Sequence, residues 1–201
     1  MNAAIILAGG KGTRLGGNYP PKALLVVKGK TLLDWQIELL KGKFDKIVLS
    51  LGHRAEEIAD YVKLKGHDVS LSIEGKPLDT AGAVKKSFKL CSEADKIYVI
   101  NVDDLARVDV SAAMKSKTPC IVAKPLPFSV LAGNKLFTQN ETFQHIGHTI
   151  LSRSDVGSLP DVGSLEKWMA SQPVVHVFEH KGLWVTINSI VQLPDAERVW
   201  Q

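Results

Sequence analysis

The stretch that decides the fold is AAIILAGGKGTRL, residues 3–15. Its first five residues form a continuous apolar run, which is typical of a strand buried on both faces of a parallel sheet. The next segment, residues 8–22, is rich in glycine and carries Lys11, Arg14 and Lys22. Ligands of open α/β sheets bind at the carboxyl ends of strands, and glycines let backbone N–H groups approach an anion closely. The stretch therefore predicts a strand followed by a phosphate-binding loop.

Two familiar phosphate-binding patterns do not fit this loop. A Walker A loop requires GxxxxGK[ST], which is absent from the sequence. The dinucleotide fingerprint requires GxGxxG, but Gly10 and Gly12 are followed by Leu15 where the third glycine would stand. An ordinary glycine-rich turn is the alternative for the glycines taken alone.

Outward from this stretch, strands and helices alternate through the first hundred residues. We expect strands over 3–7, 46–51, 69–73 and 96–101, and helices over 32–40, 56–65 and 80–90, with Thr31 as an N-cap. The remainder is less regular, with strands expected over 120–123, 174–178 and 183–187 and helices over 165–170 and 195–200. This alternation predicts βαβ units and a mostly parallel mixed sheet in a single three-layer α/β domain over 1–201.

Composition narrows the class of protein. Of 201 residues, 45% are apolar and 23% are charged, which suits one globular domain. The net charge of +4 fits a phosphate-rich ligand, whereas the scattered basic residues do not favour nucleic acid. Cys91 and Cys120 form no CxxC pair and suggest no disulfide framework. Because no signal-like or membrane-spanning stretch occurs, we expect a cytoplasmic protein that does not bind membranes.

Several segments together resemble the sugar-1-phosphate nucleotidyltransferases. The N-terminal segments that carry the resemblance are LAGGKGTRL (7–15), PKAL (21–24) and GKTLL (29–33). Further matches are EGKPLDTAGA (74–83), INVD (100–103), SLE (164–166) and LWVTIN (183–188). The form of residues 72–74 and the short chain look most like the mannose or heptose phosphate guanylyltransferases.

The resemblance implies a nucleotide-diphospho-sugar transferase fold with a Rossmann-like nucleotide-binding half (1–105) and an acceptor- or sugar-binding half (106–201). It implies transfer from a nucleoside triphosphate, GTP before ATP, to a phosphorylated sugar, with release of pyrophosphate. The residues that the resemblance assigns to the nucleotide are Leu7, Ala8, Gly9, Gly10, Gly12, Thr13, Thr80, Ala81 and Gly82. Those assigned to catalysis are Arg14 and Lys22, those assigned to the acceptor are Lys124, Gly147 and Glu166, and Asp103 is assigned to Mg²⁺ or Mn²⁺. A homodimer is one option for the oligomeric state.

Each of these assignments has a simpler structural alternative. Lys22 could be a solvated loop lysine, and Thr80 is equally well placed to cap a helix. Glu166 could pair with the dipole of a helix start. Asp104 could cap a turn beside Asp103, or assist it at the metal.

Three positions depart from the family pattern. Asp79 replaces a glycine of the PLGTAGA segment, although its carboxylate could accept hydrogen bonds from guanine. Val102 replaces the middle glycine of NGD, and Thr186 stands where the family has a second metal-binding aspartate. A noncatalytic nucleotide- or sugar-phosphate-binding protein therefore remains an alternative. A guanylyltransferase with another acceptor, similar to the molybdopterin guanylyltransferases, is a third reading that PLDTAGA argues against.

Two pairs of histidines are spaced closely enough to be candidate metal ligands. His145 and His148 are three residues apart, and His176 and His180 are four apart. Neither pair has a convincing third ligand, and the HExxH pattern is absent. We expect these histidines to be ordinary surface or sheet residues.

Overall fold

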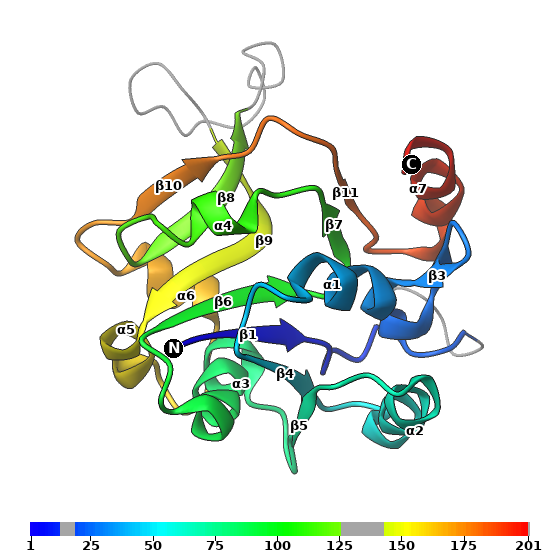
Figure 1. Cartoon of the computed structure of the whole chain (residues 1–201), viewed down its shortest axis with the longest axis horizontal. Helices are drawn as coiled ribbons and strands as arrows, with labels where there is room; N and C mark the ends of the chain where they lie inside the picture. The colour runs from blue at the N-terminus through cyan, green and yellow to red at the C-terminus, as the bar shows by residue number, and fades with distance from the viewer. Residues whose placement is uncertain (13–18, 126–142, 201) are drawn as a thin grey trace.

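The computed structural model describes residues 1–12, 19–125 and 143–200. Seven strands form the main sheet in the order β10-β8-β9-β6-β1-β4-β5 (Figure 1). Their bounds are β1 (Asn2–Leu7), β4 (Lys46–Leu51), β5 (Ser70–Ile73), β6 (Lys96–Asn101), β8 (Cys120–Pro125), β9 (Phe143–Ser152) and β10 (His176–Glu179). Only β9 runs antiparallel to its two neighbours in this sheet, and the other pairings are parallel. The predicted mostly parallel mixed sheet is confirmed.

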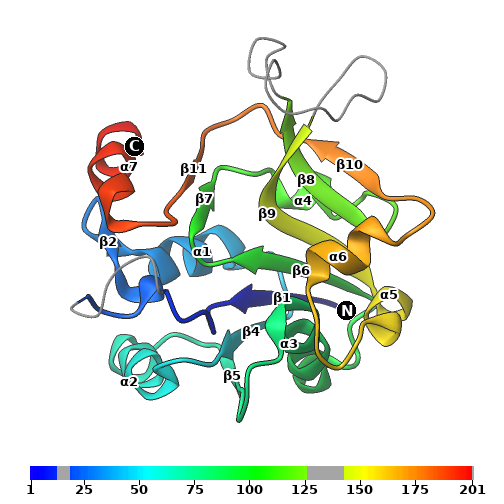
Figure 2. The ribbon, with the colours of Figure 1, turned by 180° about the vertical axis from the view of Figure 1, so that it is seen from behind.

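Helices cover both faces of the sheet, which gives the predicted three layers. One face packs against α1 (Leu32–Leu40), α2 (Ala55–Lys65), α4 (Val110–Ala113) and α7 (Leu193–Val199). The other packs against α3 (Asp79–Phe88), α5 (Arg153–Ser158) and α6 (Leu165–Ala170). Helix α1 lies in front of the sheet in Figure 1, and α6 lies in front of it in Figure 2.

The central strand β1 shows how the sequence produces this layering. Ala4 and Ile6 point into the core beneath α1, whereas Ala3 and Ile5 point into the core beneath α3. All four side chains are fully buried, as the uninterrupted apolar run predicts for a strand covered on both faces. Residues of β1, β4 and β6 are in parallel register, so Leu7 lies beside Ser50 and Asn101. The loops that follow these strands therefore meet at one edge of the sheet.

Two predictions about helix starts have different outcomes. Thr31 caps α1 as predicted, because its side chain accepts a hydrogen bond from the Asp34 N–H while Asp34 accepts one from the Thr31 N–H. Thr80 as an N-cap is wrong, since α3 begins at Asp79 and Leu78 stands at the cap. The Thr80 hydroxyl instead accepts a hydrogen bond from the Leu165 N–H at 2.8 Å. Thr80 thus joins the start of α3 to the start of α6.

Strand β9 is the largest element that the sequence did not predict. Its ten residues, FQHIGHTILS, include a glycine and two histidines, so neither an apolar run nor a regular alternation marks them. The strand is nevertheless buried from Ile146 to Leu151. His148 compensates for its polarity by pairing its Nδ1 with the Tyr98 hydroxyl at 2.8 Å.

Smaller elements lie outside the main sheet. Strand β11 (Trp184–Thr186) pairs antiparallel with β7 (Asp104–Ala106), and β2 (Val26–Val27) pairs with β3 (Lys30–Thr31). The short 3-10 helices are η2 (Lys22–Leu24), η3 (Lys89–Cys91) and η5 (Ile190–Gln192). The strand predicted over 174–178 begins two residues later, as β10. Among the described residues, no helix has both the length and the apolar character needed to cross a lipid bilayer.

Candidate functional site

A cavity of about 200 Å³ opens where the strand ends converge. Its walls come from the ends of β1, β4 and β6, the glycine loop and the start of α3. The lining residues are Leu7, Ala8, Gly9, Gly10, Gly12, Lys22, Ser50, Glu74, Asp79, Thr80, Ala83, Asn101, Val102 and Asp103. The structure therefore brings five predicted loop residues, Lys22, Thr80 and Asp103 to one cavity. Thr13 and Arg14 lie outside the described residues.

The glycines of the loop have different local roles. The Gly9 carbonyl accepts a hydrogen bond from the His53 N–H, and a Cβ added to Gly52 would lie 2.7 Å from that same oxygen. Gly9 and Gly52 thus allow two backbone segments to touch. A Cβ on Gly10 would meet no atom of the described residues within 4 Å, and Gly12 has a φ of +58°. The glycine-rich pattern after β1 marks Gly9, whereas Gly52 stands alone after β4 and no motif in the sequence marks it.

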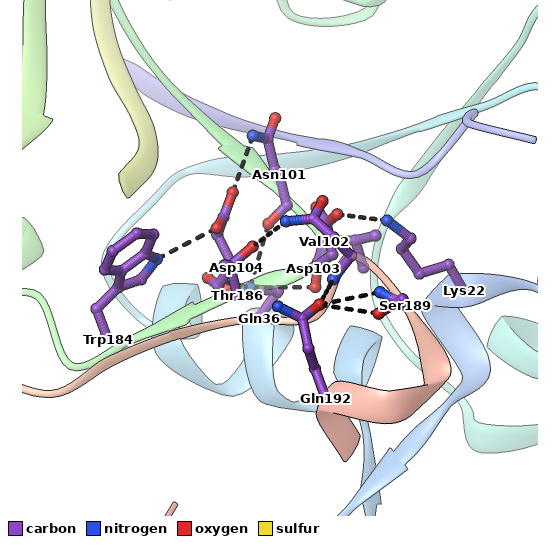
Figure 3. Close-up of polar contacts among 11 residues, drawn as sticks. Lys22, Gln36, Asn101, Val102, Asp103, Asp104, Trp184, Thr186, Ser189 and Gln192 are labelled. Atoms are coloured by element: carbon purple, nitrogen blue, oxygen red, sulfur yellow. Dashed lines mark hydrogen bonds and ion pairs between the residues drawn. The ribbon is translucent and has the colours of Figure 1, made fainter. Parts of the chain in front are cut away.

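Lys22 and Asp103 face each other on the cavity wall (Figure 3). The Lys22 Nζ lies 2.6 Å from the Asp103 Oδ2, and both side chains are about 19% exposed. Pro21 precedes Lys22 at the start of η2, and Asp103 lies in the turn between β6 and β7. The Asp103 carbonyl also accepts a hydrogen bond from the Ile187 N–H, which fixes that turn. A cation and an anion are therefore held together beside the glycine loop.

Asp104 points away from this pair and into the protein (Figure 3). Its carboxylate accepts hydrogen bonds from the Asn101 Nδ2 at 3.0 Å and the Trp184 Nε1 at 3.2 Å. Burial, reinforced by the charge of Asp103, raises the pKa of the Asp104 carboxyl. The suggestion that Asp104 caps a turn is wrong, because it belongs to β7 and its carboxylate links three chain segments. These contacts also leave it poorly placed to replace a metal ligand.

The buried side chain of Gln36 supports the backbone from Asn101, at the end of β6, to Asp104, at the start of β7. The Gln36 Nε2 donates to the carbonyl oxygens of Asn101 and Asp104 at 3.2 Å and 2.9 Å, with Val102 also in range. Gln36 projects from α1 and is 1% exposed. The sequence pattern marks it only as a member of a helical face, so this role could not be predicted.

The segment from the end of β5 to the start of α3 contributes two carboxylates to the cavity. Glu74 accepts a hydrogen bond from the Leu78 N–H at 3.2 Å, and burial raises the pKa of its carboxyl group. Asp79 has a φ of +59°, a conformation that favours glycine, which is the residue the family has there. Of the predicted trio at this helix, Thr80 lines the cavity. Ala81 and Gly82 are buried, and a Cβ on Gly82 would collide with the Asp161 carbonyl oxygen.

A second cavity of about 520 Å³ adjoins the first. It shares Leu7, Asp79, Thr80 and Asn101 with the first cavity and extends over β9 and β8 beneath α6. The predicted acceptor residues Gly147 and Glu166 line it. Lys124, also assigned to the acceptor, is not among the residues that line either cavity. Its Nζ donates to the Gly182 carbonyl at 3.3 Å.

Comparison with known proteins gives the family. Residues 4–117 match the family described as MobA-like NTP transferase domain. The chain belongs to that family. A D-glycero-alpha-D-manno-heptose 1-phosphate guanylyltransferase of Aneurinibacillus thermoaerophilus is 38% identical over 112 residues, which are 53% of this chain and 48% of the relative. The enzyme of the same name from Campylobacter jejuni is 32% identical over 129 residues, 61% of this chain and 58% of the relative.

The chain thus spans about half the length of these curated relatives. A solved structure of HddC from Yersinia pseudotuberculosis, complexed with GMP-PN, superposes with a TM-score of 0.77 at 24% identity over all of both chains. At that identity the match shows the fold alone, a single α/β domain with a mostly parallel mixed sheet. The match of an MobA-like NTP transferase domain to residues 4–117 covers both carboxylates of the β6–β7 turn and the whole glycine loop.

The residues of this MobA-like domain fit a divalent cation held largely by a substrate. Among the described residues, no three His, Cys, Asp or Glu side chains converge as a metal cluster. Asp103 provides one carboxylate beside a loop suited to phosphate, and Mg²⁺ is often bound by one or two carboxylates together with substrate phosphates. The histidines do not add to this set, because none lines the first cavity and His148 is paired with the Tyr98 hydroxyl.

Proposed function

We propose that this chain transfers the guanylyl group of GTP to a sugar 1-phosphate and releases pyrophosphate. The observation that carries the proposal is the Lys22–Asp103 pair, 2.6 Å apart on the wall of a glycine-loop cavity. A loop that only binds a nucleotide would not need a lysine ammonium group paired with an aspartate carboxylate on the cavity wall. The named heptose 1-phosphate guanylyltransferases among the relatives support the choice of reaction.

The reaction is an in-line displacement at the α-phosphorus. An oxygen of the sugar phosphate forms a bond to the α-phosphorus. At the same time, the bond between the α-phosphorus and the oxygen that bridges the α- and β-phosphates breaks. Pyrophosphate leaves with the bonding electron pair. Because both reactants are anions, the protein must orient them and supply positive charge. We assign the orientation to the N–H groups of the loop from Gly9 to Gly12 and the charge to Lys22.

Asp103 is the residue that we expect to hold Mg²⁺ or Mn²⁺ with the nucleotide. Such an ion neutralises and orients phosphate oxygens. Lys22 holds the Asp103 carboxylate in place before the nucleotide binds. When the triphosphate enters, the Lys22 ammonium group can turn to the α-phosphate, where negative charge accumulates during the displacement.

Glu74 and Asp79 support guanine as the base. Guanine presents N1–H and N2–H₂ donors on one edge, which a carboxylate can accept together. Uracil and thymine present one N–H between two carbonyl oxygens, so a carboxylate there would repel them. Both side chains line the first cavity from the segment between β5 and α3, whereas Lys22 lines it from the segment that follows β1. We therefore place the base between Glu74, Asp79 and the start of α3.

We assign the acceptor to the second cavity, where Glu166 can accept hydrogen bonds from sugar hydroxyls and the Gly147 backbone forms part of the wall. The cavity draws on residues before and after position 105, so the nucleotide half (1–105) and the acceptor half (106–201) both contribute to it. Since GTP is consumed, we place the reaction in the cytoplasm.

The test is a pyrophosphate-release screen that crosses the four ribonucleoside triphosphates with a panel of sugar 1-phosphates. Wild type should release pyrophosphate with GTP and at least one sugar phosphate. Asp103→Asn should reduce that release at least about 100-fold, because it removes the anionic ligand. Asp68→Asn, at an exposed aspartate outside both cavities, is the matched control and should retain wild-type activity.

A noncatalytic binding protein is the second candidate, and Thr186 is the observation that favours it. Its hydroxyl accepts a hydrogen bond from the Asn188 Nδ2 at 3.2 Å and offers no carboxylate. Calorimetric binding of GTP without pyrophosphate release from any pair of substrates would support this alternative.

A further inference from the structure

The floor of the second cavity is a row of side chains on three adjacent strands. Val99 on β6 lies opposite Thr149 on β9, and Thr149 lies opposite Ile121 on β8. Residues directly opposite each other point to the same face of a sheet, so the three side chains form one surface. Two of the three are aliphatic, and all three line the cavity.

The roof and far wall of this cavity are also apolar. Helix α6 contributes Leu165, Met169 and Ala170, and Val175 closes the wall just before β10. Leu165 and Met169 belong to the same buried cluster as Val99. An atom placed between Met169, Ile121 and Val175 would therefore meet mainly carbon.

Several polar side chains of this cavity already have partners in the protein. The Thr80 hydroxyl accepts from the Leu165 N–H, and the Ser164 hydroxyl accepts from the Lys167 N–H at 3.3 Å. The Thr149 hydroxyl lies 3.3 Å from the His145 Nε2. The other polar lining residues include Asp79 and Asn101, which belong to the end shared with the nucleotide cavity. The cavity is thus polar toward the nucleotide and apolar at its far end.

The far end lies well away from the phosphates. Ile121 is on β8, which is separated from β1 by β9 and β6. Three strand spacings of about 4.8 Å place Ile121 roughly 14 Å across the sheet from Leu7, where the two cavities join. A hydroxyl buried at that end would lose its hydrogen bonds to water without gaining others, which is unfavourable.

We propose that the acceptor is a sugar 1-phosphate with an apolar substituent, a methyl or acyl group in place of a hydroxyl, that binds between Ile121, Met169 and Val175. This inference rests on the proposed function for the phosphate end of the acceptor. Glu166, in the first turn of α6, accepts hydrogen bonds from the remaining hydroxyls of the ring. The apolar group then occupies volume that a fully hydroxylated hexose would leave to poorly bonded water.

The experiment compares three acceptors built on one ring: mannose 1-phosphate, its 6-deoxy analogue and its 2-acetamido analogue. Initial rates with GTP give kcat/KM from pyrophosphate release, and saturation-transfer NMR gives binding without turnover. At least one apolar analogue should exceed mannose 1-phosphate in kcat/KM by about fourfold or more, the factor expected for burying one methyl or methylene group. The two analogues distinguish a methyl from an acyl substituent.

Neighbouring valines provide a matched pair of variants. Val175→Thr introduces a hydroxyl into the cavity wall at constant shape, and should reduce the preference for the apolar analogue about fivefold. Val174 is 59% exposed and does not line the cavity, so Val174→Thr should leave the preference unchanged. Equal stability of the two variants in urea would exclude an effect of folding.

The outcomes separate this inference from the proposed function. If no pair releases pyrophosphate but an apolar analogue binds best and Val175→Thr weakens it, the acceptor inference stands and the transfer reaction fails. If mannose 1-phosphate is the best substrate and Val175→Thr changes nothing, the transfer reaction stands and the acceptor inference is overturned. If none of the three sugar phosphates binds, the inference is overturned as well.

Discussion

Asp104 lies directly opposite Thr186 in the antiparallel pair formed by β7 and β11. The carboxylate of Asp104 is buried, and Thr186 places a neutral side chain on the same face of this strand pair. The sugar-1-phosphate nucleotidyltransferase pattern has an aspartate at position 186, so this chain carries its second carboxylate on the opposite strand. The buried carboxylate is held by Asn101 and Trp184 rather than directed at Asp103.

Restoring the family aspartate alone should therefore destabilise the protein. Thr186→Asp places a second negative charge on the same face as the buried Asp104 carboxylate. We expect a loss of about 1–3 kcal/mol in the free energy of unfolding, because like charges would then face each other across the strand pair with little water to screen them. Urea unfolding of wild type and variant measures the loss.

The double exchange Asp104→Thr with Thr186→Asp should recover most of that stability, because one carboxylate again faces one hydroxyl. Equal stability of wild type and Thr186→Asp would contradict the interpretation of the pair as electrostatically coupled.

The sequence predicted the half of the fold in which local patterns agree with the final environment. β1, β4 and β6 are apolar runs buried between helices, and the segment after β1 has the glycines that a tight loop requires. Strand β9 was missed because its polar residues are satisfied by distant partners. His148 is acceptable in the core only because Tyr98 lies beside it.

The site was predictable as a set of residues but not as an arrangement. The glycine loop and Lys22 follow from one short segment, whereas the contact of Lys22 with Asp103 spans 81 positions in the sequence. That contact depends on β1 and β6 being neighbours, which no local pattern specifies. The separation of Asp103 from Asp104 is also not specified by a local pattern, because Asp103 lies in a turn whereas Asp104 begins β7 and is directed into the protein.

Gly52 and Gly10 should respond differently to alanine. A Cβ at Gly52 would lie 2.7 Å from the Gly9 carbonyl oxygen, so Gly52→Ala must displace the loop and should cost about 1–3 kcal/mol of stability. The methyl group of Gly10→Ala meets no atom within 4 Å in the part of the chain that the structure describes, so this variant should fold normally. Because Gly10 lines the first cavity, its methyl group should weaken GTP binding. Thermal unfolding measures the stability of the two variants, and calorimetric titration measures their affinity for GTP. Wild-type GTP affinity in Gly10→Ala would contradict the placement of the triphosphate at this loop.

Lys22→Ala should lower activity much more than stability. Its contact with Asp103 is partly solvent-exposed, so its loss should cost at most about 1 kcal/mol of unfolding free energy. A charge-assisted contact to phosphate is worth about 1.5–3 kcal/mol, which corresponds to about 10- to 150-fold in transition-state stabilisation. Steady-state kinetics with GTP measure the effect, and Lys41→Ala, at an exposed lysine after α1, is the control. Wild-type kcat/KM in Lys22→Ala would remove Lys22 from the mechanism.

The pH dependence of nucleotide binding should reveal whether Glu74 reads the base. Burial, with a contribution from the charge of Asp79, raises the pKa of the Glu74 carboxyl above its ordinary value of 4.5, although the Leu78 N–H and Lys86 oppose the shift. Guanine donors favour the ionised carboxylate, so protonation competes with GTP. Affinity should therefore be full above the raised pKa and fall up to tenfold per unit as pH decreases below it.

Several comparisons isolate this effect from titration of the triphosphate. UTP carries the same phosphates as GTP. The ratio of GTP affinity to UTP affinity should therefore decrease as the pH is lowered in wild type and stay constant in Glu74→Gln. Glu56→Gln, at an exposed glutamate of α2, should behave as wild type. The loss should begin at a higher pH than an unshifted glutamate would give, because the free protein holds the Glu74 proton more tightly. A ratio that is independent of pH in wild type would mean that another group, with Asp79 the nearest alternative in the cavity, selects the base.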